Sequence, residues 1–335
     1  MKSANSPEIL LQILAERIRE NYKDSKKEIL TDENLSTKEY MESIKWGVIP
    51  TLENPSFKER FKRVSHIFRE HLSDLTNVPV ISPHMNPAEY TEGFSQIIKQ
   101  GGWLVHESDD LTQFQKGDEN WGIAAVRLHE GVSQEAYAYF PRKEYMMIAK
   151  RSEGAYIVSD SNKHRTALHT SKNKPARNMV VPRYPEDVTD MLLAAPLRIA
   201  YYQSEHDIQI HMVNGILART HLIVTGEVDL GYEVEYLYDR HLIRSERVLL
   251  LTSDLLLKES GGYSCNLVES GEEIDYSKKR IDGTGYVMCN QKENAPAIVR
   301  RINQVINRKS LLIPTEVPED LSALLAPRRG HKKNN

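Results

Sequence analysis

Apolar residues recur at a helical spacing of three to four positions through residues 1–100, and this spacing predicts helices. The clearest stripe follows Asn54-Pro55, and its members are Phe57, Phe61, Val64, Phe68, Leu72 and Leu75. Shorter stripes predict helices near residues 6–18, 36–44 and 86–100, each opened by a capping residue or a proline. Residues 1–100 are therefore expected to form a helical N-terminal region.

The pattern changes to alternation after this region, where short apolar runs are separated by turn residues. These runs predict strands at residues 103–105, 121–128, 134–140, 145–149 and 155–158. We expect a β-rich core domain over residues 101–291, then a C-terminal helix and extension over 292–326 and a basic tail over 327–335. The fold class predicted is α+β, with a helical N-terminal layer followed by a mainly antiparallel sheet with hairpins and a C-terminal helix.

Residues 206–224 alternate on both sides of Asn214-Gly215, a pair that suits a two-residue hairpin turn. The register set by that turn places His206, Arg219 and His221 on one face of the hairpin. Two imidazoles and a guanidinium on an aliphatic surface are typical of a pocket for an anionic ligand. The alternative is that both histidines lie half-exposed at the end of the sheet, where backbone groups satisfy them.

A second alternating segment, residues 231–248, predicts another hairpin in which Glu233 faces Glu246 and Glu235 faces Arg244. Opposed carboxylates repel each other, and the raised pKa of one of them is how a general acid arises. The alternative is a solvated charged face. The register of this hairpin is less strongly determined, because its turn places an arginine where positive φ is costly.

Residues 163–177 hold five Lys or Arg and two His without any acidic residue. In a chain of net charge −3 this is a local excess of positive charge, which could hold a phosphate group. The four basic residues predicted to bind substrate are Arg165, Lys172, Lys174 and Arg177. No glycine-rich phosphate loop accompanies them, so a solvated loop is the alternative.

Another place where polar groups could gather is the end of the strand at residues 103–105. His106 and Glu107 follow that strand, and Asp109 and Asp110 make the next loop acidic.

The composition of the chain excludes some classes of protein but does not indicate a particular reaction. Hydrophobic residues make up 40% of the 335, net charge does not indicate nucleic-acid binding, and no apolar run approaches the length of a membrane segment. Two cysteines and no cleaved signal peptide favour the cytoplasm, with export by another route left open. No histidine or cysteine spacing indicates a metal site, and no motif indicates a particular cofactor.

Two functional hypotheses follow. The first is an enzyme acting on a phosphate-bearing or nucleotide-like substrate by group transfer or hydrolysis. The basic residues, His206 and Arg219 would bind this anionic small molecule, and His221, Glu233 and Glu235 would be catalytic. The second is a non-catalytic protein–protein interaction module that uses its helical N-terminus and charged surfaces to contact a protein partner.

Overall fold

The computed structural model describes residues 6–31, 55–109, 119–160, 164–174, 176–181, 209–213, 215–233, 243–266, 286–296 and 299–300, and structural statements are confined to them. Within these ranges, none of the helices combines the length and the apolar character that a membrane crossing requires.

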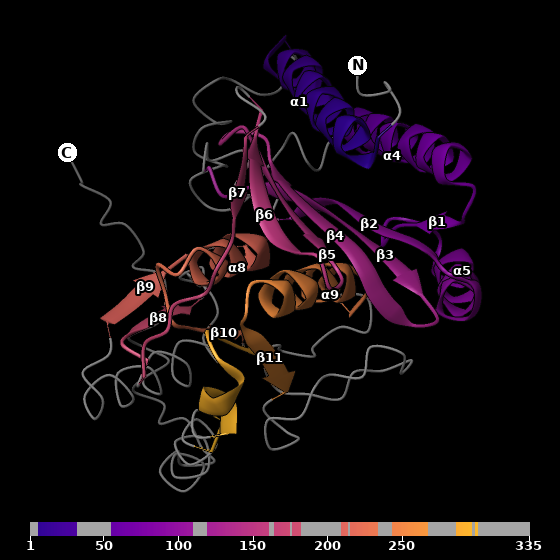
Figure 1. Cartoon of the computed structure of the whole chain (residues 1–335). Helices are drawn as coiled ribbons and strands as arrows, with labels where there is room; N and C mark the ends of the chain where they lie inside the picture. The colour runs from indigo at the N-terminus through magenta and orange to yellow at the C-terminus, as the bar shows by residue number, and fades with distance from the viewer. Residues whose placement is uncertain are drawn as a thin grey trace, which may run out of the picture.

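A seven-stranded sheet lies at the centre of the molecule, with its strands side by side in chain order (Figure 1). Its first two strands are parallel and every later pair is antiparallel. The strands are β1 (Val80–Ile81), β2 (Gly102–Asp109), β3 (Gly122–His129), β4 (Val132–Phe140), β5 (Tyr145–Lys150), β6 (Gly154–Ser159) and β7 (Arg165–Ala167). The predicted antiparallel strands are therefore confirmed, and short turns join β3, β4, β5 and β6 as hairpins.

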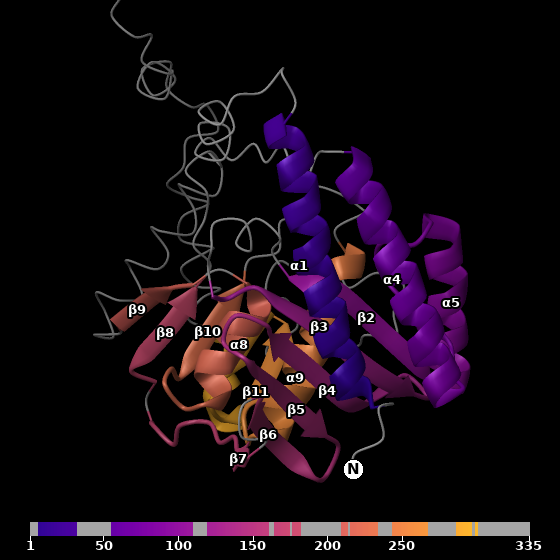
Figure 2. The same cartoon turned by 90° about the horizontal axis from the view of Figure 1, so that it is seen from above.

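Two long helices, α1 (Pro7–Thr31) and α4 (Pro55–Thr76), cover one face of this sheet and lie side by side over it (Figure 2). Their stripes of apolar residues pack against the aromatic side chains of β2 and β4, among them Trp103 and Tyr137. The shorter α5 (Pro87–Gln100) is capped by Asn86, whose side chain accepts a hydrogen bond from the Ala88 amide.

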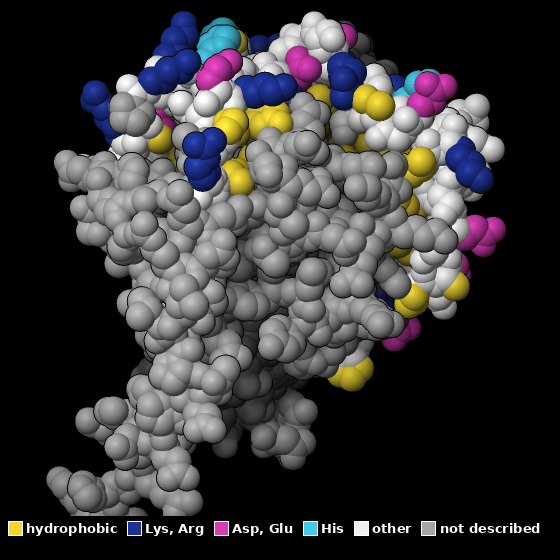
Figure 3. Space-filling view, turned by 90° about the horizontal axis from the view of Figure 1, so that it is seen from below, with side chains coloured by type: hydrophobic (Ala, Val, Ile, Leu, Met, Phe, Trp, Pro, Cys, Tyr) yellow, Lys and Arg dark blue, Asp and Glu magenta, His cyan; other side chains and the backbone are white. Residues whose placement is uncertain are grey.

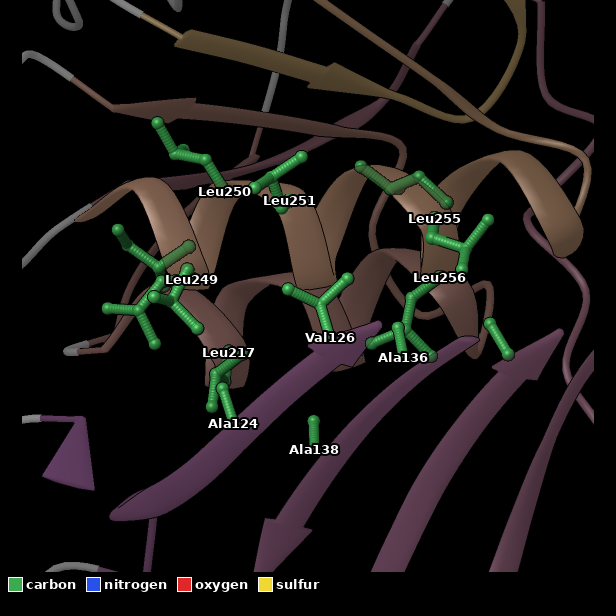
Figure 4. Packing of buried hydrophobic residues seen from close by; sticks show 14 of the residues in the cluster. Ala124, Val126, Ala136, Ala138, Leu217, Leu249, Leu250, Leu251, Leu255 and Leu256 are labelled. Atoms are coloured by element: carbon green, nitrogen blue, oxygen red, sulfur yellow. The ribbon is translucent and has the colours of Figure 1, made fainter. Parts of the chain in front are cut away.

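The opposite face of the sheet packs against α8 (Ile216–Val224) and α9 (Ile243–Glu259). Small side chains on the strands, such as Ala136 beside Val126, allow the leucine-rich α9 to approach closely (Figure 4). Leu250 lies on the other side of α9, away from these strand residues. Apolar residues surround α9 because the helix is buried between two sheets.

The second sheet has five strands in the order β11-β12-β10-β8-β9 and mixes parallel and antiparallel pairs. Its strands are β8 (Asn178–Val181), β9 (Gln209–Met212), β10 (Leu230–Glu233), β11 (Tyr263–Asn266) and β12 (Tyr286–Cys289), and η1 (Lys292–Asn294) follows the last. The layers are thus helices, sheet, helices and sheet. The α+β class is confirmed, as an α/β sandwich.

Both predicted hairpins at residues 206–248 are wrong in their second half. The segment after Gly215 forms α8 rather than a returning strand, and β9 pairs in parallel with β8. Likewise β10 is a strand, but residues 243–259 form α9. The segment after Gly215 is an apolar run that could be buried as strand or helix, whereas in residues 243–248 polar and charged residues predominate and the apolar residues show no helical spacing. In both cases packing between the two sheets, which the local pattern does not encode, selects the helix.

Candidate functional site

Polar side chains gather where β1 and β2 end, because the carboxyl ends of two neighbouring parallel strands lie at the same edge of the sheet. Ser82 and His84 come directly after β1, and His106 and Glu107 lie in the last half of β2. We call these four residues, together with Ser65 and Arg69 of α4, the Glu107 cluster.

The carboxylate of Glu107 is fully buried and has partners from two elements. The Ser82 hydroxyl donates a hydrogen bond of 2.6 Å to Oε2, and Nε2 of His84 lies 3.7 Å from the same oxygen. On the other side, Nη1 of Arg69 lies 3.9 Å from Oε1. A buried carboxylate is costly unless it is paired, so the Arg69 guanidinium supplies the balancing charge.

Helix α4 can reach this cluster because residues four apart share a helix face. Phe61, Ser65 and Arg69 follow one another along that face, and the Phe61 ring meets the His84 ring edge-on at 5.1 Å. Both Ser65 Oγ and Glu107 Oε1 are buried and make no hydrogen bond to the described part of the chain. The cluster therefore retains hydrogen-bonding capacity that a bound molecule could use.

The two histidines differ in their environment. Burial, and secondly the neighbouring His84, lowers the pKa of His106 to about 3, so this imidazole is neutral near pH 7. The His84 ring lies 5.8 Å from the His106 ring, and its side chain is 34% exposed. His84 is thus the more solvent-accessible of the two imidazoles.

The structure separates two of the residues expected to share a pocket. Arg219 and His221 lie two positions apart on α8, where side chains point in nearly opposite directions. Arg219 is buried and donates a hydrogen bond of 2.8 Å to the carbonyl oxygen of Val213. His221 stacks on Tyr145 at 5.1 Å, and burial lowers its pKa to about 4. The face that they were expected to share is not formed, and their ligand roles stay predictions.

Residues 163–177, which we call the basic stretch, connect the two sheets, so their basic side chains do not gather in one pocket. The Arg165 guanidinium lies over the Tyr156 ring at 4.6 Å in the first sheet. Lys174 lies next to the second sheet, with its Nζ 3.8 Å from Oε2 of Glu293. Lys172 and Arg177 are exposed. On the face that Figure 3 shows, basic and acidic side chains of the described residues are interspersed.

Of the three remaining predicted site residues, the structure describes one. Glu233 is in β10, where its backbone pairs with Tyr286. His206 and Glu235 lie outside the described residues.

The side chains of the described residues determine whether a divalent metal ion could bind in the cluster. Divalent cations such as Mg²⁺ prefer several carboxylate or carbonyl oxygens around one point. In the ranges given above, no three His, Cys, Asp or Glu side chains are grouped in this way. The Glu107 cluster offers one carboxylate, already hydrogen-bonded and adjacent to a guanidinium, so the described residues do not fit a divalent metal site.

The strand end at His106 and Glu107 was visible in the sequence as a place for polar groups. Its partners on α4 and after β1 were not, because only the packing of α4 on the sheet brings them there.

Comparison with models of protein families finds no match. Among curated proteins, 74 residues are 28% identical to the proposed Nus factor SuhB of two Neisseria meningitidis strains. This match spans 22% of the chain and only 28% of the length of those relatives.

Solved structures resemble the chain over most of its length. The inositol monophosphatase (IMPase) of Thermotoga maritima has a TM-score of 0.54 at 12% identity, covering 74% of this chain and 83% of that one. For SuhB of Mycobacterium tuberculosis the TM-score is 0.54 at 12% identity, covering 89% and 93%. An IMPase/NADP phosphatase complexed with Mg²⁺ and phosphate gives 0.52 at 14% identity, covering 72% and 79%. At these identities the likeness shows the fold alone, and that fold is the α/β sandwich of the inositol monophosphatase and SuhB structures.

Proposed function

We propose that this protein hydrolyses a phosphomonoester of a small molecule at the Glu107 cluster. The observation that carries the proposal is a buried carboxylate with an arginine and a partly exposed histidine at a sheet edge. The solved proteins that share its fold include an IMPase and an IMPase/NADP phosphatase, which favours a phosphate-bearing substrate. The cytoplasmic location and an anionic small molecule as partner remain part of this proposal.

Each of three side chains has a role in the proposed reaction. Arg69 binds the phosphoryl oxygens, because a planar guanidinium can donate two hydrogen bonds to a phosphate. Glu107 holds Arg69 and His84 in place. His84 donates a proton to the ester oxygen as water attacks phosphorus and the bond between phosphorus and that oxygen breaks. The proton released by the attacking water restores His84 through solvent.

The test is the release of inorganic phosphate from a panel of sugar, inositol and nucleotide phosphomonoesters. We expect Glu107→Gln to lower kcat by about 10²-fold or more, because Arg69 and His84 lose the charge that positions them. The matched control is Glu70→Gln on α4, whose side chain is exposed. Wild-type protein that hydrolyses nothing in the panel, or a folded Glu107→Gln variant with unchanged turnover, would overturn the proposal.

The second candidate function is the non-catalytic interaction module. It is favoured by the donor set, because a phosphatase of this fold is solved with Mg²⁺ and the described residues here form no group of metal ligands. In that case phosphorylated ligands or a protein partner would bind without any turnover.

A further inference from the structure

Side chains of the chain itself lie beside both oxygens of the Glu107 carboxylate. Oε2 accepts a hydrogen bond from Ser82, which is fully buried, and Oε1 lies 3.9 Å from the Arg69 guanidinium. Glu107 is completely buried and the Arg69 side chain is 15% exposed, so salt screens the pair weakly. The Arg69–Glu107 pair is therefore part of the packed interior of the protein.

A cation bound to Glu107 would have to coexist with this guanidinium. A metal ion at normal coordination distance from Oε1 would lie about 6 Å or less from Nη1, given oxygen–metal distances of about 2 Å. Like charges at that distance repel strongly where water is excluded. On the Oε2 side, the Ser82 hydroxyl proton occupies one lone pair and His84 stands 3.7 Å away.

We infer that Arg69 is the fixed counter-charge of Glu107 and that the site binds its phosphate ligand without a divalent cation. The inference rests on the proposed function for the identity of the ligand, but its claim about cations stands on the Arg69–Glu107 pair. It sets this chain apart from the IMPase/NADP phosphatase solved with Mg²⁺, although the two share a fold.

The experiment titrates Mn²⁺ alone into the full-length protein and follows free Mn²⁺ by electron paramagnetic resonance. Mn²⁺ serves as a probe for Mg²⁺ because both prefer oxygen ligands. We expect no saturable binding to wild-type protein in the millimolar range. Arg69→Met should gain a saturable site, with affinity at least about tenfold above wild type, because the repelling charge is gone.

Two variants assign the result to this cluster. Arg69→Met combined with Glu107→Gln should lose the gained site, and Arg63→Met, which changes an exposed arginine of the same helix, should behave as wild type. Circular dichroism shows whether each variant is folded. If Arg69→Met does not fold, the comparison of wild type with Glu107→Gln decides the matter.

Saturable binding of Mn²⁺ by wild-type protein that Glu107→Gln removes would overturn the inference. A folded Arg69→Met variant that gains no binding would overturn the role of Arg69. Neither result depends on turnover, so failure of the proposed function, seen as absence of phosphate release, is distinguishable from failure of the inference.

Discussion

At the scale of single residues, burial determines the charge of His106 and His221. Burial lowers the pKa of His106 to about 3 and that of His221 to about 4. In the unfolded chain both would take up a proton near pH 6.5, the ordinary pKa of histidine. Between pH 6.5 and these lowered pKa values, both histidines are therefore protonated in the unfolded chain and neutral in the folded protein.

We predict that the free energy of unfolding falls as pH is lowered from about 6.5 towards 4, because the unfolded state then binds more protons than the folded state. Each histidine contributes a slope of up to about 1.4 kcal/mol per pH unit. Urea denaturation at several pH values measures the slope. His221→Phe, which keeps a ring on Tyr145, should make the slope shallower. An unchanged slope in this variant would contradict the assignment.

Cys265 and Cys289 are both buried in the core of the second sheet. Burial raises the pKa of each thiol to about 12, and only the thiolate is a nucleophile. We therefore predict that neither thiol of the native protein reacts with iodoacetamide at pH 8 over hours, while both react in guanidinium chloride; mass spectrometry counts the labels. Rapid labelling of either cysteine in the native protein would show that it is accessible.

At the scale of elements, the polar residues of the basic stretch (residues 163–177) bind Asp229 of the chain itself and are not directed to a ligand. Asp229, buried before β10, accepts hydrogen bonds from the Ser171 hydroxyl, the Asn173 side chain at 3.0 Å and the Arg177 amide at 2.7 Å. The Asn178 amide donates a fourth at 3.1 Å. The Ser171 hydroxyl is thus directed inward to this carboxylate.

Asp229→Asn should destabilise the protein by about 3 kcal/mol. The new side-chain NH2 group would replace an acceptor oxygen, and this donor would then point at other hydrogen-bond donors in a buried place. The denaturation midpoint in urea measures this loss. Glu227→Gln, an exposed change two positions away, should alter the stability by no more than about 0.5 kcal/mol. Equal midpoints for the two variants would mean that Asp229 does not anchor the stretch.

The elements that alternation predicted correctly are those whose pairing is local. β3 to β6 follow one another through short turns, so each strand pairs with its neighbour in the chain. The segment now seen as α8 was misassigned because it is apolar enough to be buried in either conformation, and the start of α9 because the apolar residues of 243–248 show no helical spacing. The layer in which they lie is created by the two sheets together, and that information is not local.

At the scale of the whole molecule, the layered arrangement explains why the Glu107 cluster was only partly predictable. Ser82 and Glu107 lie 25 positions apart and meet because β1 and β2 are parallel neighbours. Arg69 joins them only because α4 packs across that end of the sheet. The strand end was recognisable from its residues, whereas the charge partner required the packing of layers.

The layers also separate three places where a phosphate group could bind. These are the Glu107 cluster, the basic residues near the second sheet, and a cavity of about 390 Å³ between α1 and β5 to β7 that Arg165 lines. In the first, a guanidinium lies 3.9 Å and an imidazole 3.7 Å from a buried carboxylate, which is why the proposed function is assigned to it.

The most direct test is a crystal structure of the protein soaked with inorganic phosphate, the product of the proposed reaction. We predict density for phosphate within hydrogen-bonding distance of Arg69 and His84, and no such density in crystals of Glu107→Gln soaked in the same way. Phosphate bound instead at Lys172, Lys174 or Arg177, or beside Arg165, with the Glu107 cluster empty, would contradict the assignment of the site.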